Sequence, residues 1–81
     1  MHLINEIVLD HAYGENTVTG LEEYVSSASF RVRLSSYFED VGTTPLRLAC
    51  SMSIRELKEF IEDLNDFASK KNLKVIITDD F

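Results

Sequence analysis

The sequence predicts an α+β domain in which one long amphipathic helix packs on an antiparallel sheet. Two patterns predict it: apolar residues recur at helical spacing over residues 54–68, and they alternate with polar residues over 30–34 and 46–52. The chain of 81 residues holds three glycines and one proline, which leaves no composition typical of a linker. We therefore expect a single domain over residues 1–81.

The first part of the chain predicts one strand followed by an ambiguous segment. Residues 3–9 are rich in branched side chains, which is typical of a strand, and residues 13–16 contain turn-forming types. Between Thr17 and Ser29, Thr19 and Glu22 have capping-box spacing and the apolar residues recur with a helical period. This pattern favours a short helix, and an irregular or extended edge segment is the alternative.

Two alternating segments predict a β-hairpin around a loop near Pro45. The apolar members of the first segment are Phe30, Val32 and Leu34, and those of the second are Leu46, Leu48, Cys50 and Met52. Successive side chains of a strand point to opposite faces, so both apolar sets can face the helix. The other face of the hairpin would then carry Arg31, Arg33 and Arg47.

The helix is the element that the sequence defines best. Ser53 and Glu56 have the spacing of a capping box, and the apolar side chains that follow form one stripe. Lys70, Lys71 and Asn72 suit a helix C-terminus, and residues 73–78 predict a final strand. With a short helix in residues 17–29, the element order is the ferredoxin-like β-α-β-β-α-β; without it, one helix lies across an antiparallel sheet.

Composition excludes several classes of protein. A formal net charge of −6 disfavours binding to a nucleic-acid backbone and favours a protein partner with a basic surface. No apolar run approaches the roughly 20 residues of a membrane helix, and no basic region followed by an apolar stretch opens the chain. Together with a single cysteine, these features predict a cytoplasmic protein that binds neither membranes nor nucleic acid.

The residue types of catalytic and metal sites are present without the required spacing. The three isolated glycines form neither a dinucleotide-binding nor a phosphate-binding loop. The alternating pattern predicts that Cys50 is buried and unreactive. The remaining candidates are too far apart or point apart on an extended chain: His2 with His11, Glu39 with Asp40, and Asp79 with Asp80. We therefore expect no enzyme activity, no metal and no cofactor.

Two surfaces are candidates for binding a partner. Acidic residues recur at helical spacing opposite the apolar stripe: Glu59, Glu62, Asp63 and Asp66. This acidic row is either a solvated face or, together with Glu22 and Glu23, a surface for a basic partner. If it is a free surface, reversing its four charges should leave folding intact. The alternative interface is the open sheet face with Arg31, Arg33, Arg47 and Tyr37, where a second copy could bind.

In size, charge and the order of a hairpin followed by a capped helix, the chain resembles small bacterial immunity proteins and phage inhibitors of host defence. The resemblance is one of class, because no shared motif supports it. From the acidic residues themselves we expect a non-enzymatic inhibitor that covers a basic surface of its target, with an aromatic anchor among Tyr13, Tyr37 and Phe81. The alternative function is a self-associating structural or adaptor module that uses the arginine face or an edge strand.

Overall fold

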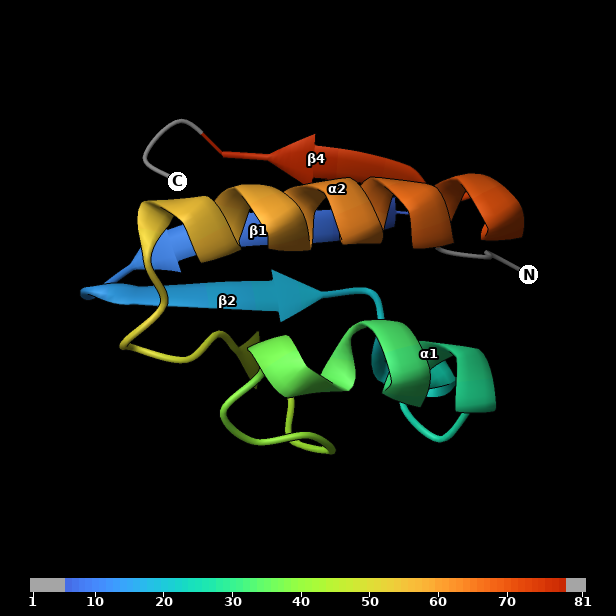
Figure 1. Ribbon diagram of the computed structural model, residues 1–81, viewed down its shortest axis with the longest axis horizontal. Coiled ribbons are helices and arrows are strands. Elements are labelled where there is room, and N and C mark those ends of the chain that lie inside the picture. The colour runs from blue at the N-terminus through green and yellow to red at the C-terminus, as the bar shows by residue number, and fades with distance from the viewer. Residues whose placement is uncertain (1–5, 79–81) are drawn as a thin grey trace.

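The computed structural model describes residues 6–78, which form a helical layer on one face of a four-stranded mixed sheet (Figure 1). The strands are β1 (Glu6–Ala12), β2 (Glu15–Thr19), β3 (Leu46–Arg47) and β4 (Lys74–Ile77). The α-helices are α1 (Ala28–Arg33) and α2 (Ile54–Lys71), and the 3-10 helices are η1 (Glu22–Tyr24) and η2 (Ser35–Tyr37). The sheet order is β3-β2-β1-β4.

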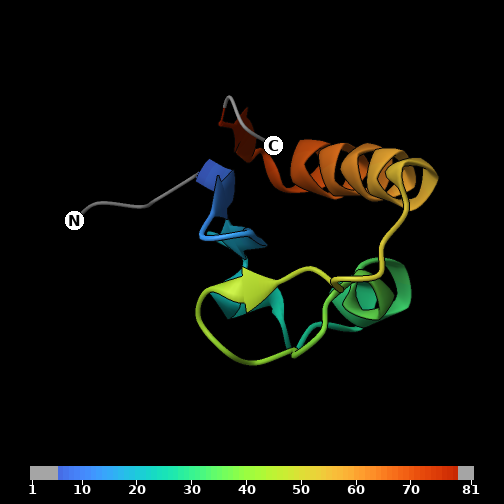
Figure 2. The same cartoon turned by 90° about the vertical axis from the view of Figure 1, so that its left-hand side faces the viewer.

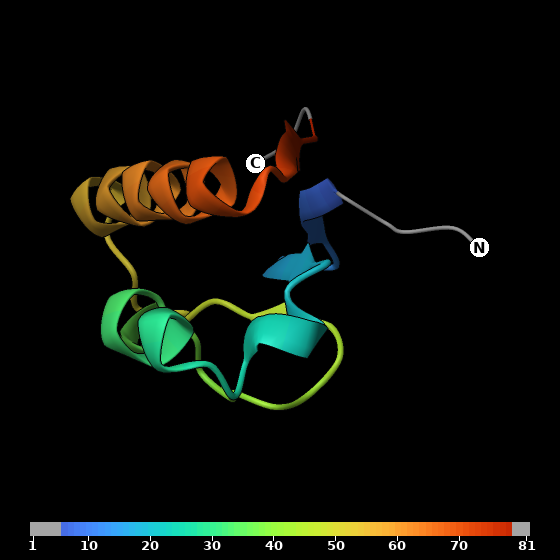
Figure 3. The same ribbon diagram turned by 90° about the vertical axis from the view of Figure 1, so that its right-hand side faces the viewer.

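The sheet pairs strands that are distant in sequence as well as neighbours. β1 and β2 form an antiparallel hairpin, β2 pairs with β3 in the antiparallel sense, and β4 pairs with β1 in the parallel sense. In the two side views, α1 and α2 lie side by side on the same face of the sheet (Figures 2 and 3). Within residues 6–78, no helix lies against the opposite face, which we call the outer face.

The core fills the space between the sheet and the two helices. Every core member is apolar, and the cluster comprises Ile7, Leu9, Val18, Leu21, Phe30, Leu34, Phe38, Leu46, Leu48, Phe60, Leu64, Phe67 and Ala68. The ring of Phe30 stacks on Phe38 at 5.9 Å and meets Phe67 edge-on at 6.0 Å. Aromatic contacts of this kind stabilise the core beyond the area they bury. The three rings join α1 and the segment after η2 to α2.

Helix α2 confirms the sequence-based prediction at both ends. The Ser53 hydroxyl accepts a hydrogen bond from the Glu56 backbone N–H at 3.1 Å, and the Glu56 carboxylate accepts one from the Ser53 N–H at 3.3 Å. Asn72 ends the helix in the left-handed conformation with φ 60°. Strand β4 follows directly, as predicted. The prediction of a strand at 3–9 is confirmed from residue 6 onward, and its first residues lie outside the described part.

The hairpin predicted between residues 30–34 and 46–52 is wrong. Residues 28–33 form helix α1, whose first turn is capped by the Ser27 hydroxyl 3.2 Å from the Phe30 N–H. Phe30 and Leu34 are four residues apart, so a helix buries both on one side and turns Val32 outward. Only Leu46 and Arg47 of the second segment belong to a strand, and Leu48 forms an isolated bridge with Phe38.

The first hairpin of the molecule instead joins β1 to β2 through Tyr13 and Gly14. Both turn residues have positive φ, 55° and 77°, as a two-residue hairpin with right-handed strand twist requires. The capping box predicted for Thr19 and Glu22 does not form, because Thr19 ends β2. Glu22 instead accepts a hydrogen bond from the Gly20 N–H at 2.9 Å. No helix separates β1 from β2, and the two strands pair in the antiparallel sense. The ferredoxin-like order, which needs a helix between its first two strands, is therefore not confirmed.

Candidate functional site

The acidic row of α2 is divided between internal contacts and solvent. Half-buried Asp63 accepts a hydrogen bond from the Tyr37 hydroxyl at 2.7 Å. Asp66 lies 3.1 Å from the Arg33 guanidinium and 3.4 Å from the Lys70 ammonium. These two carboxylates bind the segment α1–η2 to α2. The prediction that all four acids form a free surface is therefore wrong for Asp63, whereas Asp66 remains 46% exposed while it makes its two ion pairs.

The remaining acids of the row are Glu59 and Glu62, and both are exposed. Glu59 lies 3.8 Å from Arg55 one turn earlier, a solvent-exposed pair that stabilises little. Glu22 and Glu23 lie beside Val8 in a groove at the outer face of the sheet, away from α2. The structure thus does not bring these two glutamates together with the row on α2.

The arginine face predicted on the sheet is wrong as well. Arg31 and Arg33 belong to α1, and Tyr37 belongs to η2. Arg47 alone lies on a strand, where its guanidinium is 3.6 Å from the Glu15 carboxylate on β2. The physical reason is the conversion of residues 28–33 from a strand to a helix, which moves two arginines from the sheet into the helical layer.

The Tyr37 hydroxyl has a strongly perturbed environment. Its hydrogen bond to the Asp63 carboxylate, helped by burial and by the negative charges of Asp63, Glu59 and Glu56, raises the pKa of Tyr37 from 10.0 to about 12. The ring also meets Phe60 edge-on at 5.3 Å. Tyr37 is therefore held as a neutral donor inside the contact between η2 and α2, and its role as an exposed anchor is not supported by this placement.

A groove between α1 and the C-terminal half of α2 has a volume of about 450 Å³. Its apolar lining is provided by Ala28, Val32 and the edge of Phe67. Val32 stands at this groove with 84% of its surface exposed, although it is a branched apolar residue. Charged side chains border the groove: Arg33, Asp66, Lys70 and Lys71.

The border of this groove is positively charged. Arg33, Lys70 and Lys71 carry three positive charges against the single negative charge of Asp66, a local sum of +2. Lys71 extends over the aromatic floor, with its ammonium 5.9 Å from the centre of the Phe67 ring. The alternating pattern of residues 30–34 did not indicate this groove, because it predicts Val32 on a strand. The four-residue spacing of Phe30 and Leu34 behind Ser27 was the signal for the helix that builds it.

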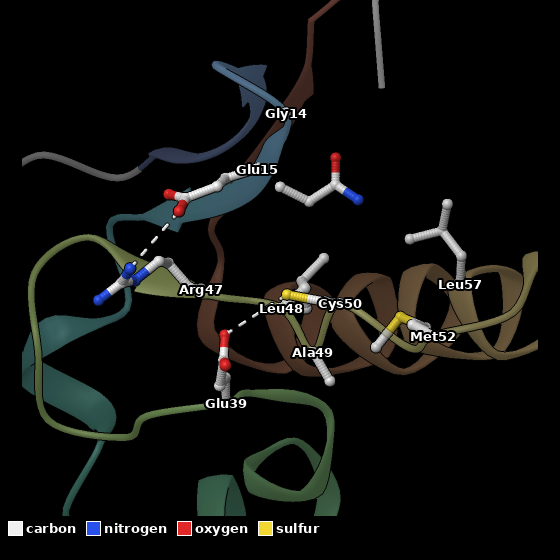
Figure 4. Close-up of a pocket in the computed structure, with 10 residues that line it drawn as sticks. Gly14, Glu15, Glu39, Arg47, Leu48, Ala49, Cys50, Met52 and Leu57 are labelled. Atoms are coloured by element: carbon white, nitrogen blue, oxygen red, sulfur yellow. Dashed lines mark hydrogen bonds and ion pairs between the residues drawn. The ribbon is translucent and has the colours of Figure 1, made fainter.

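A second, smaller pocket of about 120 Å³ lies at the opposite end of the molecule (Figure 4). Leu48, Met52 and Leu57 form its apolar side. Cys50 lines this pocket and is exposed, so the prediction that it is buried is wrong. The strand ends at Arg47, and the alternation of buried and exposed side chains therefore does not extend to residue 50. The Cys50 thiol donates a weak hydrogen bond to a Glu39 carboxylate oxygen, with 3.9 Å between the two atoms.

The other chemical candidates are dispersed. His11 is exposed and its Nδ1 lies 2.6 Å from the Asn16 side-chain oxygen. His2, Phe81 and the pair Asp79 and Asp80 lie outside the described residues. Over residues 6–78 there is no group of three side chains that could hold a metal ion, and no helix is long and apolar enough to cross a membrane. Comparison with known protein families, curated proteins and solved structures finds no match to this chain.

Proposed function

We propose that this chain is a small non-enzymatic protein that binds and blocks a protein partner through the groove between α1 and α2. The observation that carries the proposal is Val32, an 84% exposed apolar side chain beside an apolar groove of about 450 Å³. Exposed apolar residues gathered at a groove with a polar border are typical of a binding site. An isolated exposed valine without a groove would carry no such meaning.

The charge around the groove indicates the chemistry of the partner segment. The whole chain carries −6, yet the border of the groove sums to +2. Complementary charges direct association and determine specificity, so the favoured occupant is an acidic segment. Its apolar side chains would cover Val32 and Ala28 while its carboxylates meet Lys70 and Lys71. Amphipathic helices commonly bind in grooves of this kind.

The energy of this contact comes mainly from Val32, because the Phe67 ring beside it is already buried, at 4% exposed. Burying one branched side chain contributes roughly 1.5–3 kcal/mol. The charged border contributes mainly to the association rate, because exposed ion pairs stabilise a complex little. Reaction chemistry has little support here, since Ser29 is the single hydroxyl and no histidine or cysteine is among the residues that line the groove.

The test uses random peptides displayed against the intact protein, followed by binding measurements with the enriched peptides. We expect enrichment of acidic peptides with apolar residues at a spacing of three or four. Val32→Glu should weaken their binding at least tenfold, because it places a like charge in the groove. Val41→Glu is the matched control, since Val41 is an exposed valine outside the groove, 39% accessible. Equal binding by wild type and Val32→Glu would refute the proposal.

Lys70→Glu with Lys71→Glu separates the charge argument from the apolar one. This pair should slow association with the same peptides, and the effect should shrink at high ionic strength. Glu59→Lys with Glu62→Lys tests the acidic-row hypothesis in the part of the row that remains exposed. The function would belong to the acidic row and a basic partner instead if Glu59→Lys with Glu62→Lys lost binding. In that case Lys70→Glu with Lys71→Glu would retain it.

A further inference from the structure

Strand β4 is an open edge of the sheet. It pairs with β1 on one side and is the last strand in the order β3-β2-β1-β4. The opposite edge differs, because residues 37–39 run beside β3: the Glu39 N–H donates to the Arg47 carbonyl at 2.8 Å and the Ala49 N–H to the Tyr37 carbonyl at 3.1 Å. Within residues 6–78, β4 is therefore the strand that offers an unpaired backbone.

The hydrogen-bond phase of the β1–β4 ladder fixes which backbone groups point outward. The Thr78 N–H donates to the Leu9 carbonyl at 3.0 Å, and Leu9 lies opposite Ile77. In a parallel ladder, alternate residues of a strand bond to the same neighbour. Ile76 therefore faces β1 with both its N–H and its C=O. The N–H and C=O groups of Val75 and Ile77 point away from the sheet.

This edge has few of the features that protect natural sheet edges. Such edges usually carry several charges, a proline or a bulge. β4 reads Lys-Val-Ile-Ile, with one charge, and Ile77 is 46% exposed. Val75 and Ile76 are half-buried, on the helix-covered face and the outer face respectively. Two apolar strips thus reach the open edge, one on each face of the sheet.

We propose that β4 pairs with β4 of a second copy in the antiparallel sense, with Ile76 on the two-fold axis. This register places Val75 opposite Ile77 of the second copy, so the four outward groups of each chain exchange four hydrogen bonds across the junction. The two four-stranded sheets become one continuous sheet. A register centred on Val75 or on Ile77 would match fewer of these groups within residues 74–78.

The side chains agree with this register. On the outer face, Ile76 meets Ile76 of the second copy, and on the other face Val75 covers the exposed Ile77. Lys74 comes opposite Thr78 of the second copy, whose hydroxyl is 2.9 Å from the Asp10 carboxylate. Asp10 of the second copy lies two strand spacings away from Lys74, about 10 Å, which is within reach of a lysine side chain. The two-fold axis repeats this opposite-charge contact, and the pairing does not depend on the groove between α1 and α2.

Single cysteines test the register in the chain of 81 residues, which also carries Cys50→Ser. Residue 76 would face its own copy across a non-hydrogen-bonded pair with a Cα–Cα distance of about 4.5 Å, which suits a disulfide. Ile76→Cys should therefore form a covalent dimer under mild oxidation, in the majority of chains. Lys74→Cys is the matched control, because its two copies would lie roughly 14 Å apart along the strands. The exposed charge contact that it removes stabilises a dimer little. Cross-linking by Val75→Cys or Ile77→Cys in preference to Ile76→Cys would overturn the register.

Proline substitution tests the pairing without any cross-link. The Val75 N–H points outward, so Val75→Pro removes a donor that the chain itself does not use. It should leave the circular dichroism spectrum unchanged and raise the dimer dissociation constant at least tenfold in sedimentation equilibrium. Val75→Thr, which keeps the N–H, should retain the dimer. Monomeric wild type at millimolar concentration, or a dimer unaffected by Val75→Pro, would overturn the proposal.

Discussion

Replacing Tyr37 with phenylalanine tests the contact between η2 and α2 directly. The substitution removes the hydroxyl that donates to Asp63 at 2.7 Å and keeps the ring, which lies 5.3 Å from Phe60. A hydrogen bond to a charged group contributes roughly 1.5–3 kcal/mol, and partial exposure places this one near the lower end. We expect Tyr37→Phe to lower the free energy of unfolding by about 1–2 kcal/mol. The Tm should fall by roughly 4–8 °C for each kcal/mol lost.

The same contact predicts a pH dependence with a definite sign. The pKa of Tyr37 in the folded protein is about 12, above its ordinary value of 10.0. Folding therefore holds this proton more tightly than the unfolded chain does, and the stabilisation is complete below pH 10. It is lost as the pH rises from 10 through about 12. Tyr37→Phe lacks this titration, so the stability difference from wild type should shrink over that range.

Urea unfolding of wild type, Tyr37→Phe, Asp63→Asn and the double variant measures both effects. The sum of the two single losses in free energy of unfolding should exceed the loss in the double variant by about 1 kcal/mol, because each single change removes the same hydrogen bond. A loss below about 0.5 kcal/mol in Tyr37→Phe, the range of ordinary surface changes, would refute the reasoning. A stability difference between wild type and Tyr37→Phe that stays constant above pH 10 would do the same.

Reversing Asp63 and Asp66 to lysine should likewise impair folding, unlike reversal of Glu59 and Glu62.

Three further changes test the backbone. Gly20→Ala should prevent folding, because Gly20 has φ +98° and an added Cβ would lie against the Glu6 carbonyl oxygen. Gly14→Ala is the control, since Gly14 has φ +77° and open space around its Cα. Equal thermal stability of the two variants would contradict this prediction. Ser53→Ala should cost about 1 kcal/mol in urea unfolding by removing the helix cap. Tyr13→Asn should gain about 1 kcal/mol, since Tyr13 has φ 55° and is fully exposed, and a loss would contradict this.

Local sequence was sufficient for the longest helix and its neighbours. Helix α2 has a capping box at Ser53, a continuous apolar stripe and a left-handed Asn72, and each of these signals acts within a few residues. Strand β4 follows at once. The sequence also indicated most of the core, because Phe30 and Leu34 are buried whether residues 30–34 form a strand or a helix.

Tertiary structure decided the short elements and the use of the charges. Six residues are too few to form a stable helix alone, so packing of Phe30 and Leu34 selects α1 over a strand. That choice exposes Val32 and brings Arg33 to Asp66 across 33 positions of sequence. The strand order depends on pairings such as that of β1 with β4, which no local pattern encodes. Which carboxylates meet solvent and which hold the helices together therefore became apparent only in three dimensions.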